Sequence, residues 1–339
     1  MRSFASDNNS GASPEIVRAV AAANEGHAVG YGDDPWTERA RSLFKREFGP
    51  EAEAFFVLNG TGANVLALSL AAGPSTCVLC AEGAHIDVDE TGAPEAAGIK
   101  VVPLAARLGK LEPEALREAL GALGNVHAAQ PSCLSISQPT ERGAVYSKPE
   151  IEELCRIAHS AGLLVHVDGA RLANAAVALG LPFRAFTVDA GVDLLSFGGM
   201  KNGLLFGEVL LVFRHELARR TPYLRKARLQ LASKMRFVSA QYEAYLEGGL
   251  WKRNAEAANA SARSLAGLVR GIEGVELEGE VETNALFARL SEDAAERLRQ
   301  EYFFYDWEGG LVRWMTSFDT TEADIEGFAA ALRRALSGT

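Results

Sequence analysis

Short apolar runs alternate with helical stretches as far as about residue 215, and this alternation constrains the fold more than any other feature. The runs are AFFVL (54–58), TCVLC (76–80), KVVPL (100–104), CLSIS (133–137), LLVHV (163–167), DLLSF (193–197) and GEVLLVF (207–213). Several are apolar throughout, as is typical of strands covered on both faces. Stretches with helical patterns, such as 112–123 and 148–162, lie between many of them. The alternation predicts an α/β fold with a mostly parallel sheet and helices on both sides.

The pattern changes after about residue 215. We expect a long helical region over 215–272, then a strand over 284–290, a helix, a strand over 311–315 and a closing helix over 322–336. A length of 339 residues suits two domains. We therefore predict an N-terminal segment (1–40) that contributes to the small domain and the active site, a large domain (41–245) and a small C-terminal α+β domain (246–339).

The charge balance excludes some partners. Lys plus Arg is 34 and Asp plus Glu is 44, which gives a formal net charge of −10. An acidic chain without a basic run is a poor match for nucleic acid or for an anionic membrane surface. No apolar stretch reaches the roughly 18–20 residues of a membrane-spanning helix. The start, MRSFASDNNSG, lacks the apolar centre of a signal peptide. We expect a soluble, cytoplasmic protein.

The cysteines do not indicate a disulfide framework or a metal site. Cys77 and Cys80 have the spacing of a redox or zinc pair, but they lie in a run that is typical of a buried strand. Neither Cys133 nor Cys155 belongs to a second pair that would complete a zinc site. We expect all four to be core residues, and we expect no metal.

Ligands of an open parallel sheet bind beyond the carboxyl ends of its strands, so the residues after each run carry most information. Gly60 and Thr61 follow the first run in NGTGAN, a glycine-rich turn that opens a helix. Such a turn offers N–H groups to a phosphate, although a tight turn with a threonine cap is an alternative. His85 follows the second run and can serve as a base, a metal ligand or a ring that stacks on a cofactor. Alternatively, the acidic stretch around it is a solvated loop.

Three further charged residues end or interrupt apolar runs. Asp168 ends one run and can hold a cationic heteroaromatic nitrogen or a metal, unless it forms a structural ion pair with Arg171. Lys201 lies between glycines just after the next run, where an amine can form an imine with a carbonyl. Arg313 interrupts LVRWM, and its fork fits a carboxylate, either of a ligand or of a structural salt bridge.

These features are more specific together than alone. A phosphate turn, a stacking ring, a carboxylate for a ring nitrogen, an imine-forming lysine and a carboxylate-binding arginine, in this order, describe a pyridoxal 5′-phosphate (PLP) site. The interval from Asp168 to Lys201 is 201 − 168 = 33 residues, close to that in PLP enzymes of the aspartate aminotransferase fold. A nicotinamide-binding oxidoreductase is a weaker interpretation, since no GxGxxG follows the first strand.

Motifs along almost the whole chain resemble those of the threonine aldolase family, in the β-eliminating lyase group of fold-type I PLP enzymes. They are SDNNSG (6–11), YGDDPWTERA (31–40), NGTGAN (59–64), AHIDVDETGAPE (84–95), HVDGARLANA (166–175), SFGGMKNG (196–203), LASKMRF (231–237) and VRWMTSFDTTEADI (312–325). The resemblance implies the PLP-dependent transferase-like fold. It also implies reversible cleavage of L-threonine, L-allo-threonine or related β-hydroxy-α-amino acids to glycine and an aldehyde.

The resemblance also implies roles for the residues that carry the cofactor. Lys201 would bond covalently to PLP, Asp168 would salt-bridge the pyridine nitrogen, and His85 would stack on the ring and is our candidate for the base. Gly60 and Thr61 would hold the phosphate.

Further residues are implied at the substrate and at a subunit interface. Ser6, Arg171 and Arg313 would hold the substrate carboxylate and a cofactor oxygen, and Tyr31 would line the cleft. Either Arg228 or Arg236 would complete the phosphate site of a neighbouring subunit. A homodimer, commonly paired into a homotetramer, follows.

Two departures from the family pattern leave parts of this interpretation open. Many relatives carry a second histidine where this chain has Gln138-Pro139-Thr140-Glu141, and many have serine where this chain has Met200. These departures leave open the Cβ stereochemistry and the identity of the base. A β-eliminating lyase, an aminotransferase and a non-catalytic interaction protein of the same fold are the alternatives.

Overall fold

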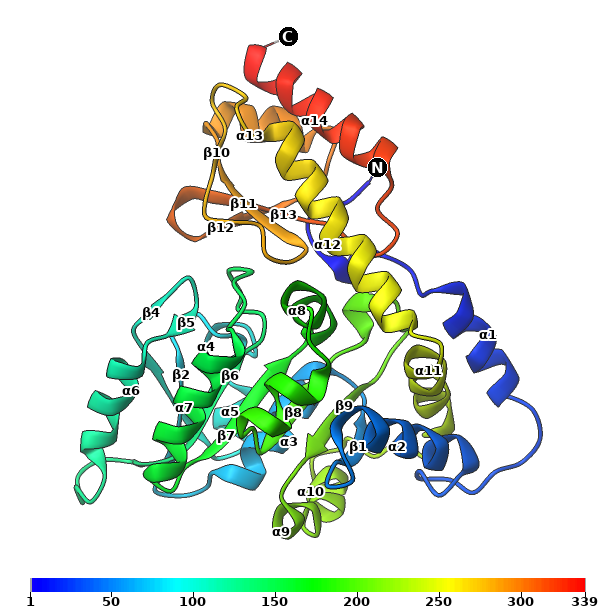
Figure 1. Ribbon diagram of the computed structural model, residues 1–339, viewed down its shortest axis with the longest axis vertical. Coiled ribbons are helices and arrows are strands. Elements are labelled where there is room, and N and C mark those ends of the chain that lie inside the picture. Colours follow the sequence, from blue (N-terminus) through cyan, green and yellow to red (C-terminus); the bar gives the residue numbers. More distant parts are fainter. Residues whose placement is uncertain (1, 339) are drawn as a thin grey trace.

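A computed structural model describes residues 2–338, and two β-sheets dominate it (Figure 1). The large sheet has the strand order β1-β9-β8-β7-β6-β2-β3. Its strands are β1 (Glu53–Val57), β2 (Thr76–Ala81), β3 (Lys100–Leu104), β6 (Gln130–Ser137), β7 (Leu164–Gly169), β8 (Leu194–Phe197) and β9 (Glu208–Val212). Each of the seven predicted apolar runs forms one of these strands, with ends shifted by a few residues.

The prediction of a mostly parallel sheet is confirmed, with one reversal. Strands β3, β2, β6, β7 and β8 are parallel to one another, whereas β9 is antiparallel to both β8 and β1. As a result β1 runs in the same direction as β8. The carboxyl ends of five strands therefore lie at one edge of the sheet, which we call the carboxyl edge. These strands are β1, β2, β6, β7 and β8.

Both faces of the central strands β8 and β9 are buried, which explains why runs such as the one in β9 are apolar almost throughout. In β9, Val209 and Leu211 pack into a cluster with helices α2 (Pro35–Phe48), α7 (Lys148–Ser160) and α11 (Arg236–Glu247). Leu210 and Val212 pack on the other face, against α3 (Gly60–Ala71). All four cysteines are buried and unpaired, as predicted for core residues.

The C-terminal part of the chain forms a smaller, antiparallel sheet that lies above the large sheet in Figure 1. Its strands, in the order β10-β11-β13-β12, are β10 (Glu276–Leu277), β11 (Ala285–Arg289), β13 (Leu311–Met315) and β12 (Tyr305–Trp307). They pack with α12 (Leu250–Val269), α13 (Glu292–Arg299) and α14 (Glu322–Ser337) around a second apolar cluster. The domain boundaries at 40 and 245 stay a prediction.

The region expected to be helical over 215–272 consists of four separate helices. It is divided into α9 (His215–Ala218), α10 (Thr221–Ala227), α11 and α12. Gly249 separates the last two, because its φ of 67° lies in the left-handed region that a helix interior does not use. The remaining elements are η1 (Asp7–Asn9), α1 (Pro14–Ala23), α4 (His85–Val88), α5 (Ala93–Ala96), β4 (Ala106–Arg107), β5 (Lys110–Leu111), α6 (Pro113–Ala119), η2 (Leu120–Ala122), α8 (Leu172–Leu179), η3 (Phe183–Phe186), η4 (Val188–Ala190), η5 (Met200–Asn202) and η6 (Glu308–Gly310).

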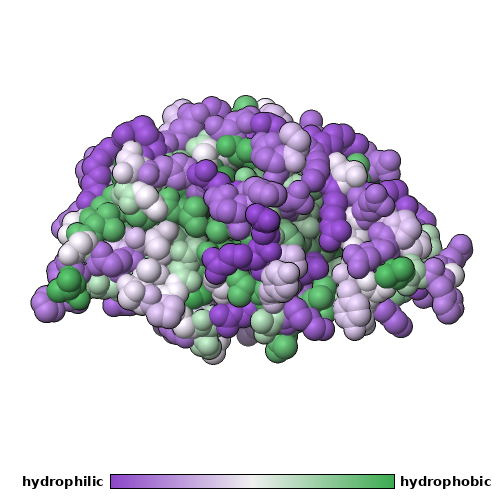
Figure 2. Space-filling model, turned by 90° about the horizontal axis from the view of Figure 1, so that it is seen from below, coloured by the Kyte–Doolittle hydropathy of each residue, from purple (hydrophilic) through white to green (hydrophobic). Residues whose placement is uncertain are grey.

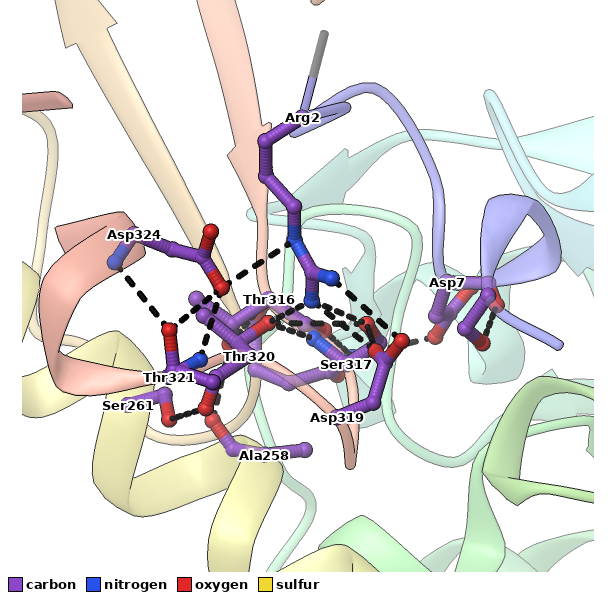
Figure 3. A network of polar contacts seen from close by, with 12 residues as sticks. Arg2, Asp7, Ala258, Ser261, Thr316, Ser317, Asp319, Thr320, Thr321 and Asp324 are labelled. Atoms are coloured by element: carbon purple, nitrogen blue, oxygen red, sulfur yellow. Dashed lines mark hydrogen bonds and ion pairs between the residues drawn. The ribbon is translucent and has the colours of Figure 1, made fainter. Parts of the chain in front are cut away.

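The N-terminal segment is built into the smaller sheet. Phe4 is fully buried in the apolar cluster of the smaller sheet. The backbone of Phe4 forms hydrogen bonds with the backbones of Phe303 and Met315. Arg2 forms ion pairs with Asp319 in the turn before α14 and with Asp324 in the first turn of that helix (Figure 3). The N-terminal segment, from Arg2 onward, is therefore fixed to the smaller sheet and to α14.

The surface is mixed in character. On the face shown in Figure 2, hydrophilic residues surround smaller groups of hydrophobic ones. Among residues 2–338, no helix has the length and apolar character needed to span a membrane. Within the same residues, no group of three or more His, Cys, Asp or Glu side chains is arranged to hold a metal ion.

Candidate active site

Four of the predicted site residues lie at the carboxyl edge. Asp168 is near the end of β7, and Lys201 is in η5, just after β8. His85 opens α4 after β2, and Thr61 lies in the first turn of α3 after β1. The topology thus brings together residues that are far apart in the sequence, as the rule for open parallel sheets predicts.

A chain of buried hydrogen bonds joins Asp168 to His85. Asn64 in α3 donates through Nδ2 to Oδ2 of Asp168 at 2.7 Å and to Oε1 of Glu90 at 2.9 Å. The same Glu90 oxygen lies 3.0 Å from Nδ1 of His85. Asn64 and Glu90 were not among the predicted site residues. The alternative of a solvated acidic loop is wrong for Glu90, whose side chain is fully buried.

The electrostatics keep Asp168 charged. Burial on its own would raise the pKa of this carboxyl group, but the charges of His85 and Lys201 and the hydrogen bond from Asn64 hold it below its usual value. For His85, the hydrogen bond to Glu90 raises the pKa above its usual value, and burial opposes that rise. The edge therefore holds an ionised carboxylate beside cationic groups.

The loop that carries Lys201 is fixed by contacts on both sides. A Cβ on Gly198 would lie 2.4 Å from the carbonyl oxygen of Ala170, so only glycine fits there. Glu208 in β9 accepts a hydrogen bond of 2.7 Å from the N–H of Gly199. Asn202 donates to the hydroxyl of Tyr245 at 2.7 Å. The Nζ of Lys201 has no hydrogen-bond or ion-pair partner within residues 2–338, so it is available for chemistry.

Two buried titratable groups near this loop were missed from sequence. Burial raises the pKa of Glu208 to about 7, against the hydrogen bonds that it accepts from Gly199 and Tyr242. Burial lowers the pKa of His166 in β7 to about 4, so this imidazole is neutral between Ser135 and Ser196, each 2.9 Å away. Both residues lie inside apolar runs of the sequence, where a single polar residue gives no indication of its hydrogen-bond partner.

The N-terminus of α3 borders a cavity of about 330 Å³. Asn59 rather than Thr61 caps this helix, since its Oδ1 accepts from the N–H of Gly62 at 2.7 Å. Thr61 and Arg228 both line the cavity. Arg236 does not line it; this arginine donates to the carbonyl of Gly26 at 3.2 Å.

Arg171 is already paired inside the chain. Its Nε and Nη2 donate to the two carboxylate oxygens of Asp7, at 2.7 and 2.9 Å, and Asn284 donates to Asp7 as well. The structural ion pair considered for Arg171 thus exists, but Asp7 and not Asp168 is its partner. This leaves Nη1 as the guanidinium nitrogen of Arg171 that can bind a ligand.

The other predicted substrate-binding residues lie between the two sheets or near the chain surface. Arg313 in β13 is buried and donates through Nη2 to the carbonyl of Ala5 at 3.0 Å, while its Nε lacks a partner within the described part of the chain. Ser6 accepts from the N–H of Asn8. Tyr31 is 51% exposed and its backbone bonds to Ser233.

A cleft of about 560 Å³ opens beside His85. Ser137 and Glu141 line it from the large-sheet side, and Trp307 and Glu308 from the smaller sheet. The guanidinium carbon of Arg313 lies 4.4 Å from the centre of the Trp307 ring, a cation–π distance. The cleft is therefore large enough for a small organic ligand, and it lies between His85 and Trp307, the ring that Arg313 contacts.

Comparison with known proteins decides the family. The model of the family described as Beta-eliminating lyase matches residues 3–293. The chain belongs to this family. Low specificity L-threonine aldolase from Pseudomonas sp. (strain NCIMB 10558) is 44% identical over 338 residues, covering 98% of both chains. The protein of that name from Pseudomonas aeruginosa is 42% identical, covering 97% of this chain and 96% of the relative.

A solved structure agrees with the family assignment. Leishmania major threonine aldolase superposes with a TM-score of 0.92 at 30% identity, covering 98% of this chain and 99% of that one. The resemblance to the threonine aldolase family and the fold class predicted from sequence are thereby confirmed. The chain is a β-eliminating lyase family member related along its whole length to threonine aldolases.

The pairing of Asp7 with Arg171 predicts a pH-dependent contribution to stability. Burial opposes ionisation of Asp7, but the charge and hydrogen bonds of Arg171 keep its pKa below the usual 3.8. We expect Asp7→Asn to lower the free energy of unfolding by about 3–5 kcal/mol at pH 7, because a buried guanidinium loses its counter-charge. A depressed carboxyl pKa stabilises the fold above the unfolded-state pKa, so the deficit shrinks as the pH falls below about 4.

Urea unfolding of both proteins at one protein concentration, at pH 7 and at pH 3–4, measures this difference. The control is Asp319→Asn, which removes a half-exposed partner of Arg2 and should cost at most about 1 kcal/mol. Equal losses in the two variants would contradict the account of Asp7.

Proposed function

We propose that this chain is a PLP-dependent aldehyde-lyase that cleaves L-threonine, L-allo-threonine or related β-hydroxy-α-amino acids reversibly to glycine and an aldehyde. Relatives that cover almost the whole chain bear the name low specificity L-threonine aldolase. One structural observation carries the proposal: the buried carboxylate of Asp168 and the unbonded amine of Lys201 lie at the same edge of the sheet.

The residues at the carboxyl edge suit PLP group by group. Lys201 supplies the amine for the covalent bond to the cofactor, and Asp168 supplies a negative charge for the pyridine nitrogen. His85 supplies a ring to stack on the pyridine, in an orientation held by Glu90. The N-terminal turn of α3, with Gly60 and Thr61, supplies N–H groups for the phosphate.

Bound PLP would withdraw electrons from the substrate bond that breaks at Cα. The chain decides which bond that is. Arg313 offers its unpartnered Nε to the substrate carboxylate, and Ser6 follows Ala5, whose carbonyl Arg313 already contacts. Arg171 retains Nη1 for the carboxylate or for a cofactor oxygen. Binding of the carboxylate by these groups would restrict the orientation of the bonds at Cα, and so contribute to the choice of the bond that breaks.

His85 is the proposed base for the β-hydroxyl group. It takes the hydroxyl proton as the Cα–Cβ bond breaks, so that Cβ leaves as the carbonyl carbon of the aldehyde. A proton returned to Cα completes glycine. Because His85 lines the cleft of about 560 Å³, the departing aldehyde has space beside it. A cleft of this size also suits β-substituents larger than the methyl group of threonine.

We also infer that two copies of the chain associate around Arg228. Apolar side chains are exposed there: Leu229 is 82% exposed, Tyr31 51% and Leu58 37%. Leu58 bonds through its backbone N–H to Gln230, and Gln230 and Arg228 line the cavity at the N-terminus of α3. Burying them against a second copy removes apolar area from water and brings a second set of basic residues near each phosphate site. A tetramer would pair two such dimers.

Sedimentation equilibrium tests the association. We expect a mass of two or four chains for the native protein, and a shift toward one chain for Leu229→Asp, which introduces a charge into the proposed interface. Val126→Asp is the matched control, because Val126 is 90% exposed in a loop near β6 and its change should leave the mass unaltered. A native protein of one chain would contradict the inference.

Visible absorption spectra test the proposed reaction. We expect the PLP-loaded protein to show a bound-cofactor band, a new long-wavelength band when glycine is added, and release of acetaldehyde from L-threonine. In Lys201→Ala the covalent cofactor band should be lost. Conversion of bound PLP to its amine form with a keto acid would instead indicate an aminotransferase. Release of ammonia from serine would indicate β-elimination, and absence of any bound-cofactor band would contradict PLP chemistry.

A further inference from the structure

Glu90 lies between the two groups that the proposed reaction uses most directly. Its Oε1 receives a hydrogen bond from Asn64 and lies 3.0 Å from Nδ1 of His85. The same amide nitrogen of Asn64 also donates a hydrogen bond to Oδ2 of Asp168, at 2.7 Å. One buried amide therefore links the carboxylate next to the predicted base with the carboxylate predicted for the pyridine nitrogen.

A carboxylate in this position requires a nearby positive charge. The Glu90 side chain has no exposed surface, and its second oxygen, Oε2, lacks a hydrogen-bond partner within residues 2–338. An unpaired charge at such a site costs several kcal/mol, and Asn64 contributes only a neutral hydrogen bond. In the same part of the chain, His85 is the one cationic group within ion-pair distance of Glu90. The charge of Glu90 thus favours a proton on Nδ1 of His85.

We propose that Glu90 is a positioning residue that fixes the proton of His85 on Nδ1, so that Nε2 is the nitrogen that exchanges protons with the substrate. The proposal rests on the proposed function for the identity of the substrate, and on the geometry alone for the effect on His85. A carboxylate behind a histidine orients the ring, selects its tautomer and stabilises the imidazolium formed when it takes a proton.

Other charged groups around His85 act more weakly. Asp89, on the same helical turn, lies 3.7 Å from Nε2, but its side chain is 81% exposed and water screens it. Asp168 on β7 and Glu141 after β6 both raise the pKa of His85, while Lys201 lowers it. The hydrogen bond to Glu90 is the largest influence, and it raises this pKa against the effect of burial.

The test is the NMR titration of His85 in the cofactor-free protein. The variant Glu90→Gln keeps an oxygen for both hydrogen bonds and removes only the charge. We expect the pKa of His85 to fall by about one unit or more, a tenfold loss of proton affinity. The spectrum of His85→Asn identifies the His85 signal among those of the six histidines. Asp89→Asn is the matched control, and it should shift the pKa by less than about a third of a unit.

A second variant keeps the proposal testable if Glu90→Gln does not fold, as circular dichroism would show. In Asn64→Ser, Glu90 loses a competing hydrogen bond but keeps its charge, so the pKa of His85 should hold or rise. A shift below about a third of a unit in Glu90→Gln, or a fall in Asn64→Ser, would overturn the proposal. The titration uses no cofactor or substrate. If the pKa of His85 falls as expected in Glu90→Gln but the native protein does not cleave threonine, the proposed function alone is contradicted.

Discussion

The buried carboxylate of Asp168 is the interaction on which the rest of the site depends. An ionised group at the end of a central strand is costly unless cations and hydrogen-bond donors face it. This chain supplies Asn64 from α3, His85 from the turn after β2 and Lys201 from the turn after β8. The fold can bring these three segments together only because β1, β2, β7 and β8 run in the same direction. Strand β9 is antiparallel to both β8 and β1, so β1 has the direction of β8.

A buried ion pair joins the smaller sheet to this site. Asp7 belongs to the N-terminal segment, in which Phe4 packs in the core of the smaller sheet. The carboxylate of Asp7 forms an ion pair with Arg171 at the start of α8. Asn284, just before β11, adds a third bond to the same carboxylate. Strand β13, which carries Arg313, is therefore held at a fixed position relative to the carboxyl edge. In the proposed reaction, the position of Arg313 relative to the carboxyl edge decides which substrate bond is aligned for cleavage.

The sequence was sufficient for the elements of the large sheet, because continuous apolar runs bounded by polar residues have few other interpretations. It also predicted that Asp168, Lys201 and His85 follow strands at one edge, where the structure has them, since residues at strand ends share an edge in a parallel sheet. It did not reveal the direction of β9, because periodicity carries no direction. Nor did it reveal the pairing of Asp7 with Arg171, which are 164 residues apart, or the burial of Glu90 within an acidic stretch. Those facts depend on tertiary contacts, for which a single sequence has no local signal.

The central claim is that Lys201 is the residue to which PLP bonds at this edge. Borohydride reduction of the PLP-loaded protein, followed by proteolysis and mass spectrometry, tests it directly, because reduction makes the bond to the lysine permanent. The account predicts a single modified peptide, with the cofactor mass on Lys201. Modification spread over surface lysines such as Lys226 or Lys234, or its absence from Lys201, would contradict the account.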